Sequence, residues 1–241
     1  SCGGSMVAPE LIRRVRETLG CGFSTLYGQT EYCPVITQHH ASDTIDDICN
    51  TAGQPVPQTE VSIRASSSGG VVPIGEVGEI CARGPCVMIE YNDNSTATAE
   101  TIDSEGWLHT GDLGAMDKRG YVTITGRVKE MIIRGGENHF PAEIENCLLD
   151  HPLVAEVAVV GLPDPKWGEV IGAFVRGVHP LDRSVLHAHC RAQMSPQKTP
   201  TVWVEVDQFP LTGSGKIQKF ALREKFVAGH FTELHGDGED G

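Results

Sequence analysis

The chain has 241 residues, enough for one large domain or two to three small ones. Its 19 basic and 32 acidic side chains give a net charge of −13. That balance excludes a typical nucleic-acid binder and a polybasic membrane-surface module, because both need an excess of cations. Hydrophobic residues make up 39% and charged residues 21%, as in globular proteins, and no apolar run approaches the roughly 20 residues of a transmembrane helix.

The chain contains eight cysteines, and no two of them have the C-x-x-C spacing. A disulfide framework is typical of much shorter secreted chains, so we expect most of these cysteines to be buried, reduced thiols. The first residues, 1–4, show no Met and no signal or transit pattern, and are typical of the middle of a protein. These features predict a cytoplasmic protein, or a mitochondrial-matrix protein if a transit peptide precedes the chain.

Taken in chain order, the first predicted element is a helix over residues 8–19, with Pro in its first turn and Gly at its end. A short strand over 23–27 follows it. From about residue 48 to 125 the pattern changes to short strands separated by Gly and Pro, which predicts a small β-barrel or sandwich. The clearest of these strands are 60–64, 79–83 and 121–125.

After residue 127 helices and strands alternate, which is typical of a compact α+β domain. The predicted helices are 141–149, 184–194 and 219–225, and the predicted strands are 154–160, 170–175 and 202–206. The final residues, GDGEDG, predict a disordered acidic tail.

Two short motifs in the first half are candidates for ligand binding. In TLYGQTE, residues 25–31, a strand runs into a glycine turn, and Glu31 offers the carboxylate oxygens that Mg²⁺ prefers. In GWLHTGDLG, residues 106–114, Asp112 is predicted to lie in a tight turn, where a carboxylate can accept hydrogen bonds from the two hydroxyls of a ribose. An ordinary strand-to-loop turn is the alternative for the first motif, and an Asp-Gly type hairpin turn for the second.

A third motif covers residues 120–145. Arg127 carries a planar guanidinium that suits a ribose or a phosphate, and the pair Gly135-Gly136 lets a backbone approach a ligand closely. A surface hairpin with solvated charges would explain the charges but not the glycine pair.

A fourth motif, residues 209–219, places Lys216 after a Thr-Gly-Ser-Gly loop. A lysine on such a loop can deliver an ammonium to developing negative charge. The motif lacks the spacing of a Walker A loop, and a solvent-exposed loop lysine is the alternative.

Together and in this order, the four motifs resemble the C-terminal half of the acyl-adenylate-forming enzymes, the AMP-dependent synthetase/ligase superfamily. The stretches RGGENHFPAE and PLTGSGKIQKFALRE are most similar to medium- and long-chain fatty-acyl-CoA ligases of the acyl-CoA synthetase family member 2 type. The resemblance implies a multidomain α/β and α+β fold. Its expected parts are the end of a large AMP-binding domain at 1–47, a β-barrel subdomain at 48–126, a small mobile α+β C-terminal domain at 127–228 and an acidic tail at 229–241.

The resemblance also implies roles for the matching residues. Nucleotide binding falls to Gly3, Gly4, Ser5, Tyr27, Gly28, Thr30, Asp112 and Arg127. In this set Tyr27 is expected to stack on adenine, Thr30 to bond the α-phosphate, and Asp112 to hold the ribose hydroxyls.

Four further assignments concern the chemistry. Glu31 is expected to bind Mg²⁺, and Lys216 to act with Thr30 and Glu31 as a catalytic residue that stabilises charge at the α-phosphate. Lys129 matches the hinge of the small domain. The glycines of the third motif, Gly135 and Gly136, match the loop that lines the coenzyme A tunnel.

The implied reaction joins a fatty acid to coenzyme A through an acyl-AMP intermediate, with ATP, Mg²⁺ and coenzyme A as cofactors and the upstream half of the same enzyme as a partner. The family's phosphate loop and most of its acyl pocket do not occur in this sequence, so inactivity of the isolated chain stays open. His139 stands where an apolar residue is expected. Two alternatives stay open: an adenylation enzyme for an aryl or amino acid, and a non-catalytic nucleotide-binding fragment.

Overall fold

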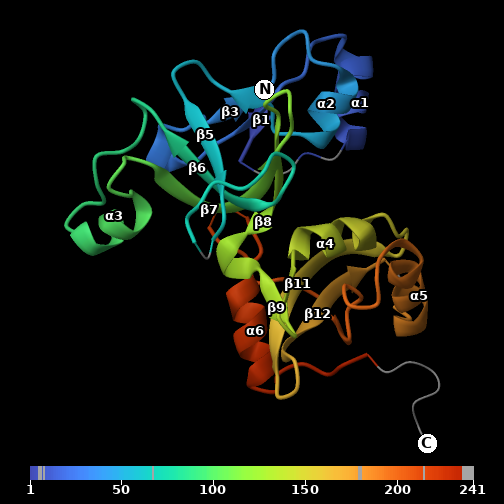
Figure 1. Cartoon of the computed structure of the whole chain (residues 1–241). Helices are drawn as coiled ribbons and strands as arrows, with labels where there is room; N and C mark the ends of the chain where they lie inside the picture. Colours follow the sequence, from blue (N-terminus) through green and yellow to red (C-terminus); the bar gives the residue numbers. More distant parts are fainter. Residues whose placement is uncertain (5–6, 8, 67, 179–180, 214, 235–241) are drawn as a thin grey trace, which may run out of the picture. The chain divides into compact units, whose positions relative to one another are not determined.

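The computed structural model describes residues 1–4, 7, 9–66, 68–178, 181–213 and 215–234. Contacts divide the chain into two compact units, Ser1–Val128 and Lys129–Gly241 (Figure 1). None of the helices in the described part of the chain combines the length and the apolar character that a bilayer crossing needs.

The first unit contains a four-stranded sheet with the order β1-β2-β3-β4. Its strands are β1 (Cys2–Gly3), β2 (Thr25–Tyr27), β3 (Thr37–Gln38) and β4 (Gln54–Pro55). The pair β1–β2 is parallel, and the other pairs are antiparallel. Three helical segments accompany this sheet: α1 (Pro9–Leu19), the 3-10 helix η1 (Thr30–Tyr32) and α2 (Ile45–Asn50). The predicted first helix is thereby confirmed.

A second sheet in the same unit is an antiparallel meander with the order β5-β6-β7-β8. Its strands are β5 (Glu60–Arg64), β6 (Gly78–Arg83), β7 (Leu108–Met116) and β8 (Val122–Arg127). Among the described residues no pairing between β5 and β8 closes this sheet, and closure would require it, so the predicted β-barrel is not shown. A short helix, α3 (Ser95–Thr101), precedes β7 and escaped the sequence prediction.

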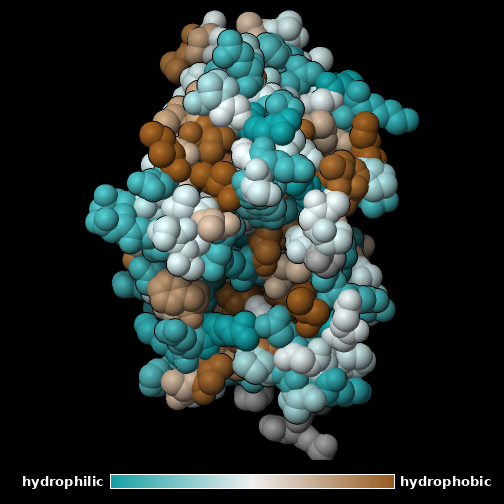
Figure 2. Space-filling model, turned by 60° about the vertical axis from the view of Figure 1, so that its left-hand side comes forward, coloured by the Kyte–Doolittle hydropathy of each residue, from teal (hydrophilic) through white to brown (hydrophobic). Residues whose placement is uncertain are grey.

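One hydrophobic cluster fills the first unit and takes side chains from both of its sheets. Its buried members are Tyr27, Tyr32, Ile36, Ala52, Ile63, Ile80, Ala82, Leu108 and Val122. Other apolar residues reach the surface, where Figure 2 shows brown side chains among hydrophilic ones. In α1, for example, Ile12 is buried while Leu11 and Leu19 are exposed.

The second unit is built on a five-stranded sheet with the order β10-β9-β12-β11, in which β13 also pairs with β12. The strands are β9 (Ile132–Arg134), β10 (Glu137–His139), β11 (Val154–Asp164), β12 (Gly168–Gly177) and β13 (Val202–Glu205). The helices are α4 (Pro141–Leu149), α5 (Arg183–Gln193) and α6 (Lys219–Val227), and the 3-10 helix η2 (Val128–Glu130) leads into the unit. Each helix and long strand predicted after residue 127 is confirmed, with boundaries shifted by a few residues.

Both faces of this sheet are buried, because successive side chains of a strand point to opposite faces. Val157 and Val159 of β11 belong to one hydrophobic cluster, which also contains Ile144 of α4 and Leu186 of α5. Ala158 and Val160 belong to a second cluster, with Leu222 of α6. Helices therefore cover the sheet from two sides (Figure 1).

The predicted acidic tail lies mostly outside the described residues, which end at 234. Before that point, Phe231 packs edge-on against Phe174 with ring centroids 5.2 Å apart, and the Leu234 amide donates to the Trp203 carbonyl at 2.8 Å. The segment just after α6 is thus held against the second unit.

All eight cysteines are free, but the prediction that most are buried is wrong. Only Cys81, Cys147 and Cys190 are buried, Cys49 is half-buried, and Cys2, Cys21, Cys33 and Cys86 are exposed. The exposed thiols lie on an edge strand or in loops, and such segments run over the surface.

Gly28 provides a direct test of the first unit. A Cβ atom at this position would overlap the carbonyl oxygen of Pro34, which is backbone and cannot rotate away. We expect Gly28→Ala to lower the free energy of unfolding of this unit by about 3 kcal/mol, as overpacking does. Gly22→Ala is the matched control, because a Cβ there meets nothing within 4 Å. Urea unfolding of both variants checks this, and equal stabilities would contradict it.

Candidate nucleotide-binding site

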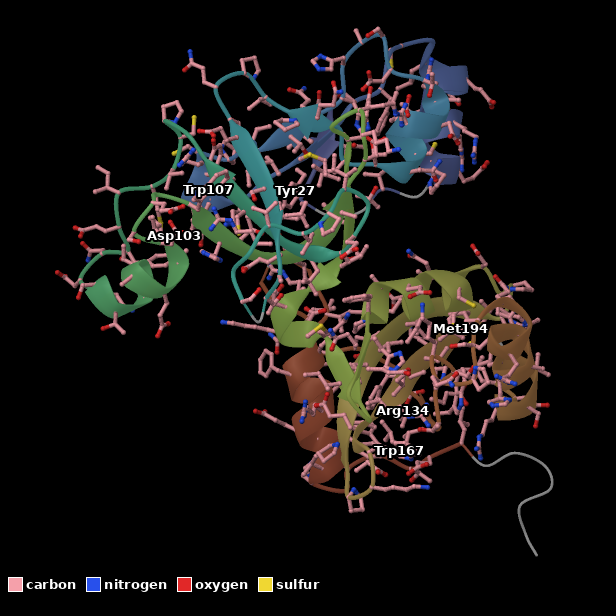
Figure 3. The ribbon with its side chains drawn as sticks, in the orientation of Figure 1. Tyr27, Asp103, Trp107, Arg134, Trp167 and Met194 are labelled. Atoms are coloured by element: carbon pink, nitrogen blue, oxygen red, sulfur yellow. The ribbon has the colours of Figure 1, made fainter. Side chains whose placement is uncertain are left out.

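A buried carboxylate, that of Asp112, lies at the centre of the candidate site. The Tyr27 hydroxyl donates to Oδ2 at 2.9 Å, and Nε of Arg127 donates to Oδ1 at 2.7 Å. Tyr27 and Asp112 are each 8% exposed, whereas the Arg127 side chain is 59% exposed. Burial, together with the negative charge of Asp112, raises the pKa of Tyr27 far above its usual value, so the phenol stays protonated and keeps donating. Figure 3 labels Tyr27.

Asp112 does not lie in a tight turn, as the sequence predicts, but in the middle of β7. The two flanking glycines suggested a turn, yet β7 pairs with β6 on one side and β8 on the other, and this pairing prevails. Gly111 adopts a positive φ of 70°, and the ladder to β8 is irregular after Leu113. Asp112 is the direct cross-strand partner of Arg127, which is why their opposite charges meet.

The turn after β2 carries the next group of candidates. Gly28 connects Tyr27 to η1, which places Thr30 at the surface and leaves Glu31 half-buried. The Tyr91 hydroxyl donates to Oε1 of Glu31 at 2.8 Å, and this bond is the main reason that the pKa of Tyr91 is raised. The Glu31 carboxylate keeps acceptor capacity beyond this bond, which is the property that Mg²⁺ requires of a ligand. Tyr91 was missed from the sequence, since nothing in its spacing links it to Glu31.

The glycines at the start of the chain lie beside β2. Gly3 is the parallel partner of Leu26, and a Cβ on Gly3 would overlap the Leu26 side chain. Gly4 has a positive φ of 87°. Ser5, predicted to act with them, lies outside the described residues.

In the second unit the glycine pair of the third motif forms a hairpin turn. Gly135 and Gly136 connect β9 to β10 with φ values of 59° and 88°, as a two-residue turn of type I′ requires. A hairpin therefore explains the glycine pair, contrary to the sequence interpretation. Gly135 also packs against the ring of Trp167. Arg134 and Lys166 approach this ring at 5.6 and 4.7 Å from its centroid. Figure 3 labels Arg134 and Trp167.

Lys216 and Thr212 are joined by two hydrogen bonds. The Lys216 amide donates to the Thr212 hydroxyl at 3.0 Å, and the Thr212 amide donates to the Lys216 carbonyl at 2.7 Å. The residue is exposed. Lys129 is also exposed and is the first residue of the second unit.

Lys219, only three residues beyond Lys216, has a different environment that the sequence did not reveal. Its ammonium lies 2.8 Å from carboxylate oxygens of both Glu130 and Glu145. Burial alone would lower the pKa of Lys219, but the charges of Glu145 and Glu130 outweigh it and raise the pKa. The ammonium of Lys219 therefore connects α6 with Glu145 of α4 and with Glu130, which directly follows Lys129.

His139, the unexpected residue of the third motif, points inward. It is 3% exposed, and neither ring nitrogen has a hydrogen-bond partner among the described residues. Burial lowers its pKa, so the ring is neutral and takes the place of an apolar side chain in β10.

Two family models match the chain. The family model described as "AMP-binding enzyme" matches residues 1–92, and the model described as "AMP-binding enzyme C-terminal domain" matches residues 143–216. The chain is therefore the C-terminal portion of an AMP-binding, adenylate-forming enzyme, which confirms the resemblance of the four motifs.

Two known proteins are similar to this chain over most of its length. The chain is 44% identical over 230 residues to the protein YngI of Bacillus subtilis, covering 93% of this chain and 41% of the relative. It is 40% identical over 231 residues to the human mitochondrial medium-chain acyl-CoA ligase ACSF2, covering 93% of this chain and 38% of the relative. The chain belongs to the AMP-binding, adenylate-forming enzymes. It spans about two fifths of the length of these two relatives.

A solved structure shows the same fold. The o-succinylbenzoate CoA synthetase MenE of Bacillus subtilis, in complex with its acyl-adenylate intermediate, superposes with a TM-score of 0.84 at 34% identity, covering 92% of this chain and 45% of that chain. MenE is also known in complex with ATP and a magnesium ion, with a TM-score of 0.82.

The Tyr27–Asp112 bond can be tested without any ligand. Tyr27→Phe leaves a buried carboxylate oxygen without its donor, so we expect the free energy of unfolding to fall by about 1–3 kcal/mol. Tyr121→Phe is the matched control: its hydroxyl donates to Asp43 at 2.8 Å, but Asp43 is only half-buried and water can replace the donor. Urea unfolding should show the larger loss for Tyr27→Phe, and equal losses would contradict the account.

Proposed function

We propose that this chain is the C-terminal part of an acyl-CoA ligase that activates a medium- or long-chain fatty acid with ATP and transfers it to coenzyme A. The observation that carries the proposal is the buried Asp112 carboxylate with its two donors, in a chain 40% identical to a medium-chain acyl-CoA ligase. A carboxylate has about four lone-pair sites, and Tyr27 and Arg127 use two of them. The other two suit the vicinal hydroxyls of a ribose.

The reaction has two steps. In the first, an oxygen of the fatty-acid carboxylate attacks the α-phosphorus of ATP, the bond to pyrophosphate breaks, and acyl-AMP forms. In the second, the sulfur of coenzyme A loses its proton and attacks the acyl carbonyl, and the bond between the carbonyl carbon and the AMP oxygen breaks. Such transfers depend mainly on positioning and on neutralising charge.

Residues of the first unit would serve the nucleotide. Thr30 is exposed at the start of η1, where its hydroxyl can reach a phosphate, and Glu31 is the carboxylate that fits Mg²⁺. When bound, Mg²⁺ neutralises phosphate charge. The backbone of Gly3 and Gly4 beside β2 is available for adenine or the acyl carbonyl. Tyr27 is mostly buried, so stacking on adenine would use the small part of its ring that is open.

Residues of the second unit would serve the two steps in turn. The exposed ammonium of Lys216 is suited to the charge that develops at the α-phosphate. Lys129 stands at the boundary of the two units, where a hinge is expected. The turn at Gly135 and Gly136, next to a tryptophan flanked by two cations, suits the phosphate groups and base of coenzyme A.

Acid-dependent ATP–pyrophosphate exchange tests the proposal. The assay uses the full-length gene product that contains this chain and a panel of fatty, aryl and amino acids. Exchange with medium- or long-chain fatty acids is expected. An aryl-acid specificity is the second candidate, because MenE acts on o-succinylbenzoate, and exchange with aryl acids alone would favour it. No exchange with any acid in the folded protein would contradict both.

Lys216→Ala separates the two steps. We expect it to reduce exchange by about 10²–10³-fold, since it removes one cation from the charge that develops in adenylation. Thioester formation from supplied acyl-AMP should be spared. Lys225→Ala on α6 is the control, because it removes an exposed lysine outside the proposed machinery. Equal loss of both steps in Lys216→Ala would refute the role.

Lys129→Pro should have the reverse effect. Proline fixes φ at the hinge, so we expect adenylation to continue while thioester formation falls by at least tenfold. Lys129→Ala removes the same side chain but keeps the backbone free, and should lose much less thioester formation. Full overall turnover in Lys129→Pro would show that the hinge lies elsewhere.

A further inference from the structure

Three potential metal ligands meet on the second sheet of the first unit. Cys81 of β6 and His109 of β7 are direct cross-strand partners, and Glu79 lies two residues before Cys81 on the same face. The neighbours Ile80 and Ala82 point to the opposite face, into the hydrophobic cluster. One ligand atom from each of the three residues lies within 4.8 Å of the other two.

The distance between the cysteine and histidine ligand atoms suits one cation. Sγ of Cys81 lies 3.6 Å from Nδ1 of His109, which is about the separation that tetrahedral Zn–S and Zn–N bonds of 2.3 and 2.0 Å produce. Oε2 of Glu79 lies 2.8 Å from the same nitrogen, at hydrogen-bond distance, so the two atoms share a proton that a cation would replace. The other oxygen, Oε1, accepts the amide of Gly111 at 3.0 Å, which holds the carboxylate in place and directs Oε2 toward the cluster.

A fourth residue, Asp103, lies near the second ring nitrogen of His109. Oδ2 of Asp103 lies 3.7 Å from Nε2 of His109, on the side of the ring away from Cys81 and Glu79 (Figure 3 labels Asp103). Histidines that bind metals commonly direct their second nitrogen to a carboxylate, which keeps the proton on that nitrogen and leaves the first free to coordinate. Arg64 pairs with Asp103 at 3.2 Å and fixes its position.

We propose that Glu79, Cys81 and His109 form a binding site for one borderline-soft divalent cation, with Zn²⁺ as its natural occupant and Asp103 orienting His109. A thiolate, an imidazole and a carboxylate are the donor set that Zn²⁺ takes, and hard cations such as Mg²⁺ avoid thiolates. Glu79 and His109 are 15% and 27% exposed, so the cation can enter from their side, and water can complete the coordination. This site does not depend on the proposed ligase activity.

Binding of the cation releases protons from its ligands. Burial raises the pKa of Cys81 to about 12, so the thiol is protonated before the cation arrives. The sulfur forms a bond to the metal and releases its proton to solvent. The proton between Nδ1 of His109 and Oε2 of Glu79 must also leave, to solvent or to Nε2 on the Asp103 side, before Nδ1 can coordinate.

Cobalt is the probe, because Co²⁺ bound to a thiolate gives a charge-transfer absorption band that carboxylate and imidazole ligands do not give. The test uses the full 241-residue chain in which the four exposed cysteines, Cys2, Cys21, Cys33 and Cys86, are replaced by Ser to remove surface binding. We expect one Co²⁺ per chain, a thiolate band, and loss of that band when one equivalent of Zn²⁺ is added.

Two variants and one control assign the site. Cys81→Ala should abolish the band and weaken Zn²⁺ binding by at least 100-fold, whereas Cys190→Ala, which removes an equally buried thiol in the second unit, should leave both unchanged. Asp103→Asn should keep the band and weaken binding by about 10–100-fold. Absence of a thiolate band in the parent chain, or its persistence in Cys81→Ala, would overturn the proposal. The parent and Asp103→Asn results decide the question even if Cys81→Ala does not fold.

Discussion

The carboxylate of Asp112 carries its charge into the interior of the first unit, where an unpaired charge would be very costly. Tyr27 and Arg127 stabilise this buried charge, because each donates a hydrogen bond to one of the two carboxylate oxygens. Tyr27 belongs to the small sheet, and Arg127 belongs to the antiparallel meander. Their hydrogen bonds to the Asp112 carboxylate therefore help to join the two sheets of the unit. The strand that ends at Tyr27 leads directly into Gly28 and η1, and η1 carries Thr30 and Glu31.

The second unit is organised differently, because its sheet is covered on both faces and its functional candidates lie at the margins. The glycine turn of β9–β10 and the loop of Lys216 are exposed, while the sheet between them is closely packed. Lys219 joins α6 to Glu130 and Glu145, next to the boundary at Lys129.

The sequence predicts the regular elements of this fold well, because Pro, Gly and hydrophobic periodicity mark their ends. The helix Pro141–Leu149 and the strand Glu60–Arg64 have the predicted boundaries. Asp112 is the instructive exception: local glycines indicated a turn, and pairing with strands on both sides overrode that local signal.

The partners of the site residues were harder to predict than the residues themselves. Tyr91 and Glu31 are 60 positions apart, and Lys219 and Glu130 are 89 apart. No periodicity or spacing connects positions so distant, so only the fold reveals these bonds. The same holds for Cys81 and His109, which become neighbours through the register of β6 and β7.

We propose that Asp112, with Tyr27 and Arg127, binds the ribose of an adenylate. Calorimetric titration of this chain with a non-hydrolysable medium-chain acyl-adenylate mimic tests it most directly, with Asp112→Asn compared against Asp207→Asn, an exposed carboxylate of the second unit. We expect saturable binding that Asp112→Asn weakens at least tenfold, about the 1.5–3 kcal/mol of a charged hydrogen bond. Asp207→Asn should leave this binding unchanged. Equal affinity of the two variants would contradict it.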